Sequence, residues 1–194
     1  MSATAPVRAH VTTVPLLAAF AGAVAVRVAL AGPAGARSAP AALVFSAVLL
    51  ALAAAAGLRT HASRAAMGIG VVAAAVLVTP AALHLAGGSD VALRLPAGQF
   101  PAWAALTVVV AGAEEAFVRG VLYDAVVARR GSDAAIVVAA AAFALLHVPF
   151  YGWHALPLDF AVGLVLGVTR LVAGTWTAPA IAHIGADFAG WWLL

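Results

Sequence analysis

The chain contains no cysteine and no lysine, and only 9% of its 194 residues are charged. Without cysteine there are no disulfides, no thiolate metal ligands and no thiol nucleophile. Hydrophobic residues make up 65% of the sequence, against about 45–50% in an average soluble domain. We therefore predict an integral membrane protein. Its apolar runs are long and unbroken rather than alternating, which favours helices over a β-barrel.

Seven apolar runs approach the length of about 17–25 residues that a helix needs to cross a bilayer. They cover residues 14–31, 41–58, 67–85, 103–127, 133–148, 156–172 and 177–194. The expected fold is an all-α integral membrane protein of about seven transmembrane helices, forming a single domain over 1–194. Within it, 1–100 is predicted to be a three-helix scaffold with almost no buried polar chemistry, and 101–194 the functional core.

The basic residues are all arginine, and most lie between the apolar runs, which is a pattern of membrane topology rather than of nucleic-acid binding. With the N-terminus inside, the inner loops would hold six of them: Arg8, Arg59, Arg64, Arg129, Arg130 and Arg170. The outer loops would hold Arg37 and Arg94, while Arg27 and Arg119 lie within spans. This bias predicts an N-terminus inside and a C-terminus outside, in a membrane that we take to be the bacterial cytoplasmic membrane.

Three charged residues, Glu114, Glu115 and Arg119, lie near the middle of the run 103–127. Each charge at the centre of a membrane helix costs roughly 2.5–3.5 kcal/mol on insertion scales. Ionisable residues inside a membrane are therefore a functional-site hypothesis by default.

The second half of the chain contains three residue pairs at i, i+4 spacing, which puts both members on one helix face. The pairs are Glu115 with Arg119, Phe143 with His147, and His183 with Asp187. They belong to the fourth, fifth and seventh predicted spans.

Members of these pairs are predicted to lie at similar depths in the membrane. Counting from the inner ends at about 1.5 Å per residue puts Glu114 and His147 both at ~22 Å, Asp187 at ~20 Å and His183 at ~14 Å. Residues from three separate helices are thus expected to meet.

The residue types suggest hydrolysis. Arg119 can hold Glu115 as a charge-assisted pair, while Glu114, which has no partner at helical spacing, is left as a general base for water. His147 can share that water or pass a proton to a leaving amine.

His183 and Asp187 can stabilise an oxyanion, Asp187 as a donor only when protonated. Alternatively, Glu114, His147, His183 and Asp187 form a ligand set acceptable to zinc or another divalent metal ion. The cofactor expectation is therefore none or one divalent metal ion.

Three motifs carry a resemblance to a known family. EEAFVRG at 114–120, FALLH at 143–147 and HIGAD at 183–187 resemble the EExxxR, FxxxH and HxxxN/D motifs of the CPBP family, which comprises CAAX endopeptidases and bacteriocin-processing or Abi-type membrane proteases. The resemblance covers about 103–188. It implies an intramembrane endopeptidase, of glutamic type or a metalloprotease, in which Glu114 and His147 activate water. His183 and Asp187 match the oxyanion-stabilising pair, and Asp187 stands where many CAAX enzymes have Asn.

The candidate catalytic residues are therefore Glu114, Glu115, His147, His183 and Asp187, with Arg119 and Phe143 in support. Other protease types fit less well, because the chain has no HExxH and no GxSxG motif. Gly185-Ala186-Asp187 faintly resembles the GxGD pattern of presenilin-like aspartyl proteases, but Ala186 breaks it.

Non-catalytic readings remain beside the catalytic one. Buried pairs can serve helix packing alone, and the chain could be a bacteriocin-immunity or scaffold protein, or a proton-coupled carrier that uses the same carboxylates. The expected partners are the lipid bilayer and a membrane-associated peptide or protein substrate, with the oligomeric state open.

Residues near the ends of the spans have simpler expected roles. Phe150, Tyr151 and Trp153 are typical of an interfacial aromatic belt, or they form a gate beside His147. Asp124 and Asp159, near span ends, are expected to be solvated or to cap helices.

Overall fold

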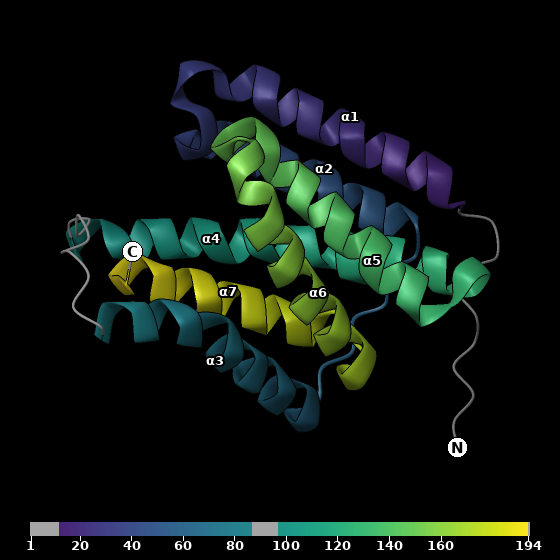
Figure 1. The fold of residues 1–194 in the computed structure, drawn as a ribbon. Coiled ribbons are helices and arrows are strands. Elements are labelled where there is room, and N and C mark those ends of the chain that lie inside the picture. The colour runs from purple at the N-terminus through teal and green to yellow at the C-terminus, as the bar shows by residue number, and fades with distance from the viewer. Residues whose placement is uncertain (1–11, 87–96, 194) are drawn as a thin grey trace.

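A computed structural model describes residues 12–86 and 97–193, and this part of the chain is helical almost throughout (Figure 1). The predicted all-α class is confirmed for these residues. The α-helices are α1 (Thr13–Ala31), α2 (Ala39–Ala55), α3 (Arg64–Ala86), α4 (Phe100–Glu115), α5 (Tyr123–Tyr151), α6 (Leu156–Ala173) and α7 (Thr177–Leu193). Short 3-10 turns η1 (Gly32–Arg37), η2 (Ala97–Gln99) and η4 (Trp153–Ala155) join some of them, and η3 (Ala116–Leu122) is a π-helix. Arg8, Arg94 and Leu194, which entered the predicted orientation and last span, lie outside the described residues.

Within residues 12–86 and 97–193, three helical stretches are long and apolar enough to cross a membrane. They are Thr13–Arg37, Phe100–Tyr151 and Trp153–Ala173, and the apolar helices Ala39–Ala55 and Arg64–Pro80 are shorter. Long apolar helices support an integral membrane protein. The number of seven spans and the orientation of the termini stay predictions.

The fourth and fifth predicted spans are joined in the structure. Helix α4 continues through η3 into α5 without an intervening coil, and only Gly131 leaves the helical conformation, at φ 81° and ψ 176°. Glycine adopts this positive φ without the steric penalty of a side chain. The chain reverses there, so that the part of α5 after Gly131 runs back toward the middle of the molecule (Figure 1). The predicted runs 103–127 and 133–148 lie on either side of this reversal.

Helix ends follow ordinary backbone chemistry. Pro40, Pro101 and Pro157 lie in the first turns of α2, α4 and α6, where a missing N–H leaves no helical hydrogen bond unmade. Gly174 ends α6 in the left-handed conformation, and its N–H donates to the Arg170 carbonyl at 3.0 Å. This is the usual glycine C-cap.

Small residues allow the helices around the site to pack closely. A Cβ added at Gly163 of α6 would lie 2.8 Å from Cα of Ala140 on α5, and one at Gly70 of α3 would lie 2.6 Å from the carbonyl oxygen of Ala178 on α7. Close backbone approach at small residues is typical of membrane helix packing. On the other side of the core, Phe20 of α1 stacks on Phe117 of η3 with ring centroids 5.4 Å apart. Helix α1 therefore packs directly on the segment that follows the two glutamates.

Candidate functional site

Glu115 and Arg119 form a fully buried ion pair. Nη1 of Arg119 donates to Oε1 of Glu115 at 2.8 Å, and both side chains are 0% exposed. Nη2 of Arg119 donates to the carbonyl of Gly163 on α6 at 3.1 Å, and its guanidinium lies 4.7 Å from the centroid of the Phe143 ring. The pair expected from i, i+4 spacing is thus present, and it also fixes α5 and α6 against η3.

His183 of α7 joins this network through Glu115. Its Nδ1 lies 3.1 Å from Oε1 of Glu115, and because an ionised carboxylate can only accept, Nδ1 carries the proton. Its Nε2 lies 3.6 Å from Oδ2 of Asp187, which is long for a hydrogen bond. The Asp187 side chain is 40% exposed, whereas His183 is buried. Nε2 is therefore the ring atom directed away from the buried ion pair.

The Phe143 ring packs between the rings of His147 and His183. Its ring centroid is 4.6 Å from that of His147 and 5.2 Å from that of His183. Residues of α4, α5 and α7 thus meet here, through the contacts of His183 with Glu115 and with Phe143.

The residue of α7 that is hydrogen-bonded to the glutamate segment is His183, through Glu115. The count along each helix put Asp187 level with Glu114, and this relative depth stays a prediction. Counting 1.5 Å per residue assumes a regular α-helix, whereas the π-helix η3 lies between Glu114 and the inner end from which its depth was counted.

His147 is held in one tautomer by its own helix. Its Nδ1 lies 2.8 Å from the backbone carbonyl of Phe143, and a carbonyl can only accept, so Nδ1 is the donor. The neutral imidazole then presents Nε2 as an acceptor. The ring stacks with that of Tyr151 at a centroid distance of 5.8 Å. His147 thus meets the geometric requirement for a residue that takes a proton at Nε2.

Glu114 has a partner that the sequence did not indicate. It is 2% exposed, and its Oε1 accepts a hydrogen bond from Nη1 of Arg27 on α1 at 3.2 Å. The expectation that Glu114 is unpaired is therefore wrong, because spacing along one helix cannot reveal a cation 87 residues earlier in the chain. The signal was still present, since Arg27 is itself a charged residue inside an apolar span.

Several buried polar atoms of the site have no hydrogen-bond partner among the described residues. Two belong to the ion pair, Oε2 of Glu115 and Nε of Arg119, and a third is Oδ2 of Asp159 on α6. Buried polar groups of this kind are where ordered water is expected.

Asp159 and Asp124, both expected near span ends, each lie close to charged or titratable side chains of other helices. Asp159 lies in the first turn of α6, as its place near a span end predicts, and it is also within electrostatic reach of both His147 and His183. Oδ1 of Asp124 accepts from Nη2 of Arg170 at 2.7 Å, and Nε of Arg170 donates to the carbonyl of Arg119 at 2.9 Å. Arg170 thereby supports the π-helix that carries Arg119.

A metal ion does not fit the side chains as they lie. Across 12–86 and 97–193, no three His, Asp or Glu side chains converge as a ligand group. Glu114 is engaged with Arg27 and His183 with Glu115. We therefore derive no chemical step through a metal.

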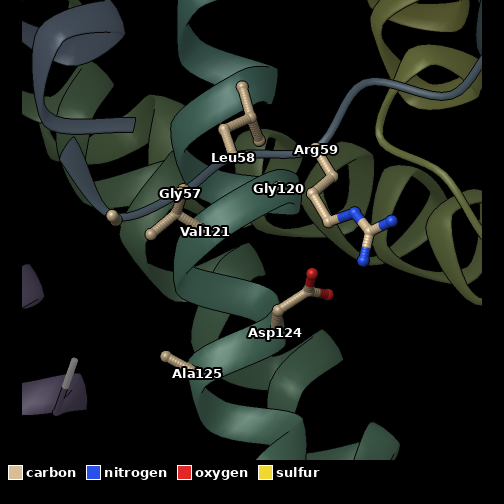
Figure 2. A pocket seen from close by; sticks show the side chains of 8 residues that line it. Gly57, Leu58, Arg59, Gly120, Val121, Asp124 and Ala125 are labelled. Atoms are coloured by element: carbon tan, nitrogen blue, oxygen red, sulfur yellow. The ribbon is translucent and has the colours of Figure 1, made fainter. Parts of the chain in front are cut away.

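A separate small cavity lies at the end of the molecule where α2 ends. Figure 2 shows Arg59 and Asp124 turned toward one another across it, beside Gly120 and Val121. Its volume is about 40 Å³, enough for a few water molecules but not for a peptide. None of the predicted catalytic residues lines it, so we do not assign the active site there.

Comparison with known proteins supports the motif resemblance. The family model described as type II CAAX prenyl endopeptidase Rce1-like matches residues 96–189. This range includes every candidate catalytic residue from Glu114 to Asp187, and it excludes Arg27. No curated protein and no solved structure matches the chain.

Proposed function

We propose that this integral membrane protein is an intramembrane endopeptidase in which Glu114 activates water. The proposal starts from the match of residues 96–189 to the Rce1-like family of type II CAAX prenyl endopeptidases. The family implies a protease whose substrate is a peptide or protein in a membrane. The observation that supports our assignment is the position of Glu114, buried and directly next to the Glu115–Arg119–His183 network. Charged groups are held there in fixed positions inside an apolar helix bundle.

In the proposed reaction Glu114 is the general base. Arg27 occupies its Oε1, which leaves Oε2 to accept a proton from a water molecule. The water oxygen attacks the peptide carbonyl carbon, and the carbonyl electron pair moves to oxygen to give a tetrahedral oxyanion. A base positioned in this way contributes about 10²–10⁴-fold to the rate.

The histidines complete the proposed proton transfers. His183 donates from Nε2 to the oxyanion when its ring is protonated, since Nδ1 is already engaged with Glu115. Nε2 of His147 receives the proton that Glu114 took from water and delivers it to the leaving amine as the C–N bond breaks. The oxyanion electron pair re-forms the carbonyl, the products are a carboxylic acid and an amine, and Glu114 and both histidines return to their starting state.

The remaining candidates have positioning roles in this proposal. Glu115 orients His183, Arg119 neutralises Glu115, and Phe143 separates the two imidazoles. Asp187, more exposed than the others, faces His183 from the side where a substrate can approach. Tyr151, half exposed beside His147, lies at the end of the same helix and is suited to contact the substrate.

Comparative proteomics of membrane-protein termini tests the proposal in cells. Strains that express the wild-type chain or Glu114→Gln are compared for new N- and C-termini, with both proteins at equal abundance in the membrane. We expect at least one terminus that depends on the wild-type chain and is lost with Glu114→Gln. Identical sets of termini in both strains would contradict an endopeptidase that depends on Glu114.

A further inference from the structure

We propose that Arg27 is a positioning residue of the active site, fixing the carboxylate of Glu114 and the helix end that carries His147. The inference rests on the proposed function, and it adds a residue of the first helix that lies outside the family match at 96–189.

The ion pair provides the first argument. Nη1 of Arg27 lies 3.2 Å from Oε1 of Glu114, and the two side chains are 12% and 3% exposed. Arg27 lies within an apolar span, Thr13–Arg37, where an unpaired charge is strongly disfavoured. In such surroundings a hydrogen-bonded pair holds both members in one geometry.

Two aromatic rings provide the second argument. The guanidinium carbon of Arg27 lies 4.8 Å from the ring centroid of Phe45 on α2 and 4.7 Å from that of Phe150 near the end of α5. A planar guanidinium stacks well on ring faces, and a lysine ammonium does not reproduce that geometry. The rings therefore orient the plane of the donors that meet Glu114, beyond what charge pairing alone requires.

The position of Phe150 connects both members of the proposed water-activating pair. Phe150 lies three residues after His147, and the next residue, Tyr151, stacks on the His147 ring at 5.8 Å. One guanidinium thus contacts Glu114 on α4 and the end of α5 that bears His147. Loss of Arg27 is expected to displace both groups, so the 1–100 region does more than support the core.

The test measures cleavage by purified wild-type protein and by Arg27→Met and Arg27→Lys. The substrate is the membrane peptide whose cleavage is lost in cells with Glu114→Gln. Because a misplacement of about 1 Å can lower a rate about 10²-fold, we expect Arg27→Met to lower kcat by about that factor with little change in KM. Arg27→Lys, which keeps the charge but not the stacking, is expected to fall between Met and wild type.

Chemical rescue separates positioning from a general loss of structure. Guanidinium ion at low concentration is expected to restore part of kcat to Arg27→Ala, because the space between Phe45 and Phe150 is then open. The same salt is expected to leave the wild type unchanged. Arg64→Met, a matched substitution of an exposed arginine at the start of α3, is expected to keep wild-type kcat with or without it.

The outcomes distinguish this inference from the proposed function. If wild type cleaves, Glu114→Gln does not, and Arg27→Met keeps wild-type kcat, the role of Arg27 is wrong while the endopeptidase assignment stands. If wild type and Glu114→Gln are equally active, the proposed function itself fails. If Arg27→Met does not fold, Arg27→Lys decides: a lowered kcat with an unchanged unfolding temperature supports the inference, and wild-type kcat overturns it.

Discussion

Replacement of Arg119 by methionine tests the buried network that holds the site together. In the wild type, Arg119 donates to Glu115 at 2.8 Å and to the Gly163 carbonyl at 3.1 Å, with 0% exposure. Arg119→Met leaves both acceptors buried without that donor. Removing one partner of a buried ion pair costs about 3–5 kcal/mol, and His183, still in contact with Glu115, should keep the loss near the lower end. At about 2–4 °C per kcal/mol for a chain of this length, a loss of about 3 kcal/mol lowers the unfolding midpoint by roughly 6–12 °C.

The double variant Glu115→Gln with Arg119→Met supplies the matched control. Glutamine removes the charge but keeps an oxygen that can accept from Nδ1 of His183. Because no unpaired charge remains buried, the double variant is expected to be more stable than Arg119→Met alone, despite its second substitution. Thermal unfolding of detergent-solubilised protein, followed through the fluorescence of its five tryptophans, measures both. An Arg119→Met protein as stable as wild type, or a double variant in which the two losses simply add, would refute this reasoning.

Two further predictions concern packing and metal dependence. Gly163→Ala should lower the unfolding free energy by about 1–3 kcal/mol, because its Cβ would lie 2.8 Å from Cα of Ala140. Gly68→Ala, whose Cβ would meet no atom within 4 Å, should not lower it. Equal stability of the two variants would contradict the packing described. A metal chelator should not reduce cleavage by the purified protein, because Glu114 is paired with Arg27 and His183 with Glu115. Loss of activity on chelation, with recovery on adding zinc, would instead support a metal bound by Glu114, His147, His183 and Asp187.

Much of the helical fold could be predicted from the chain because bilayer thickness sets the length of apolar runs. Proline and glycine then mark where several of those runs begin and end, as at Pro157 and Gly174. The i, i+4 spacing likewise places Glu115 beside Arg119 without knowledge of the tertiary structure.

The remaining features depend on contacts between distant segments. The π-helical form of η3 is supported by Arg170 of α6, which donates to the Arg119 carbonyl, and local sequence does not specify that bond. The pairing of Arg27 with Glu114 depends on how α1 packs against α4 and η3. Asp159 lies at the helix end that its place in the sequence predicts, in the first turn of α6, but only tertiary packing brings it within electrostatic reach of His147 and His183.

The catalytic role of Glu114 is tested most directly with purified protein and the peptide identified in cells. Hydrolysis is measured for wild type, for Glu114→Gln, and for Val108→Ala, a control on the same helix whose side chain is exposed. The account predicts that Glu114→Gln, assayed at a temperature where it is folded, lowers kcat by about 10²–10⁴-fold, while Val108→Ala retains the wild-type value. A folded Glu114→Gln protein that cleaves the peptide at the wild-type rate would contradict it.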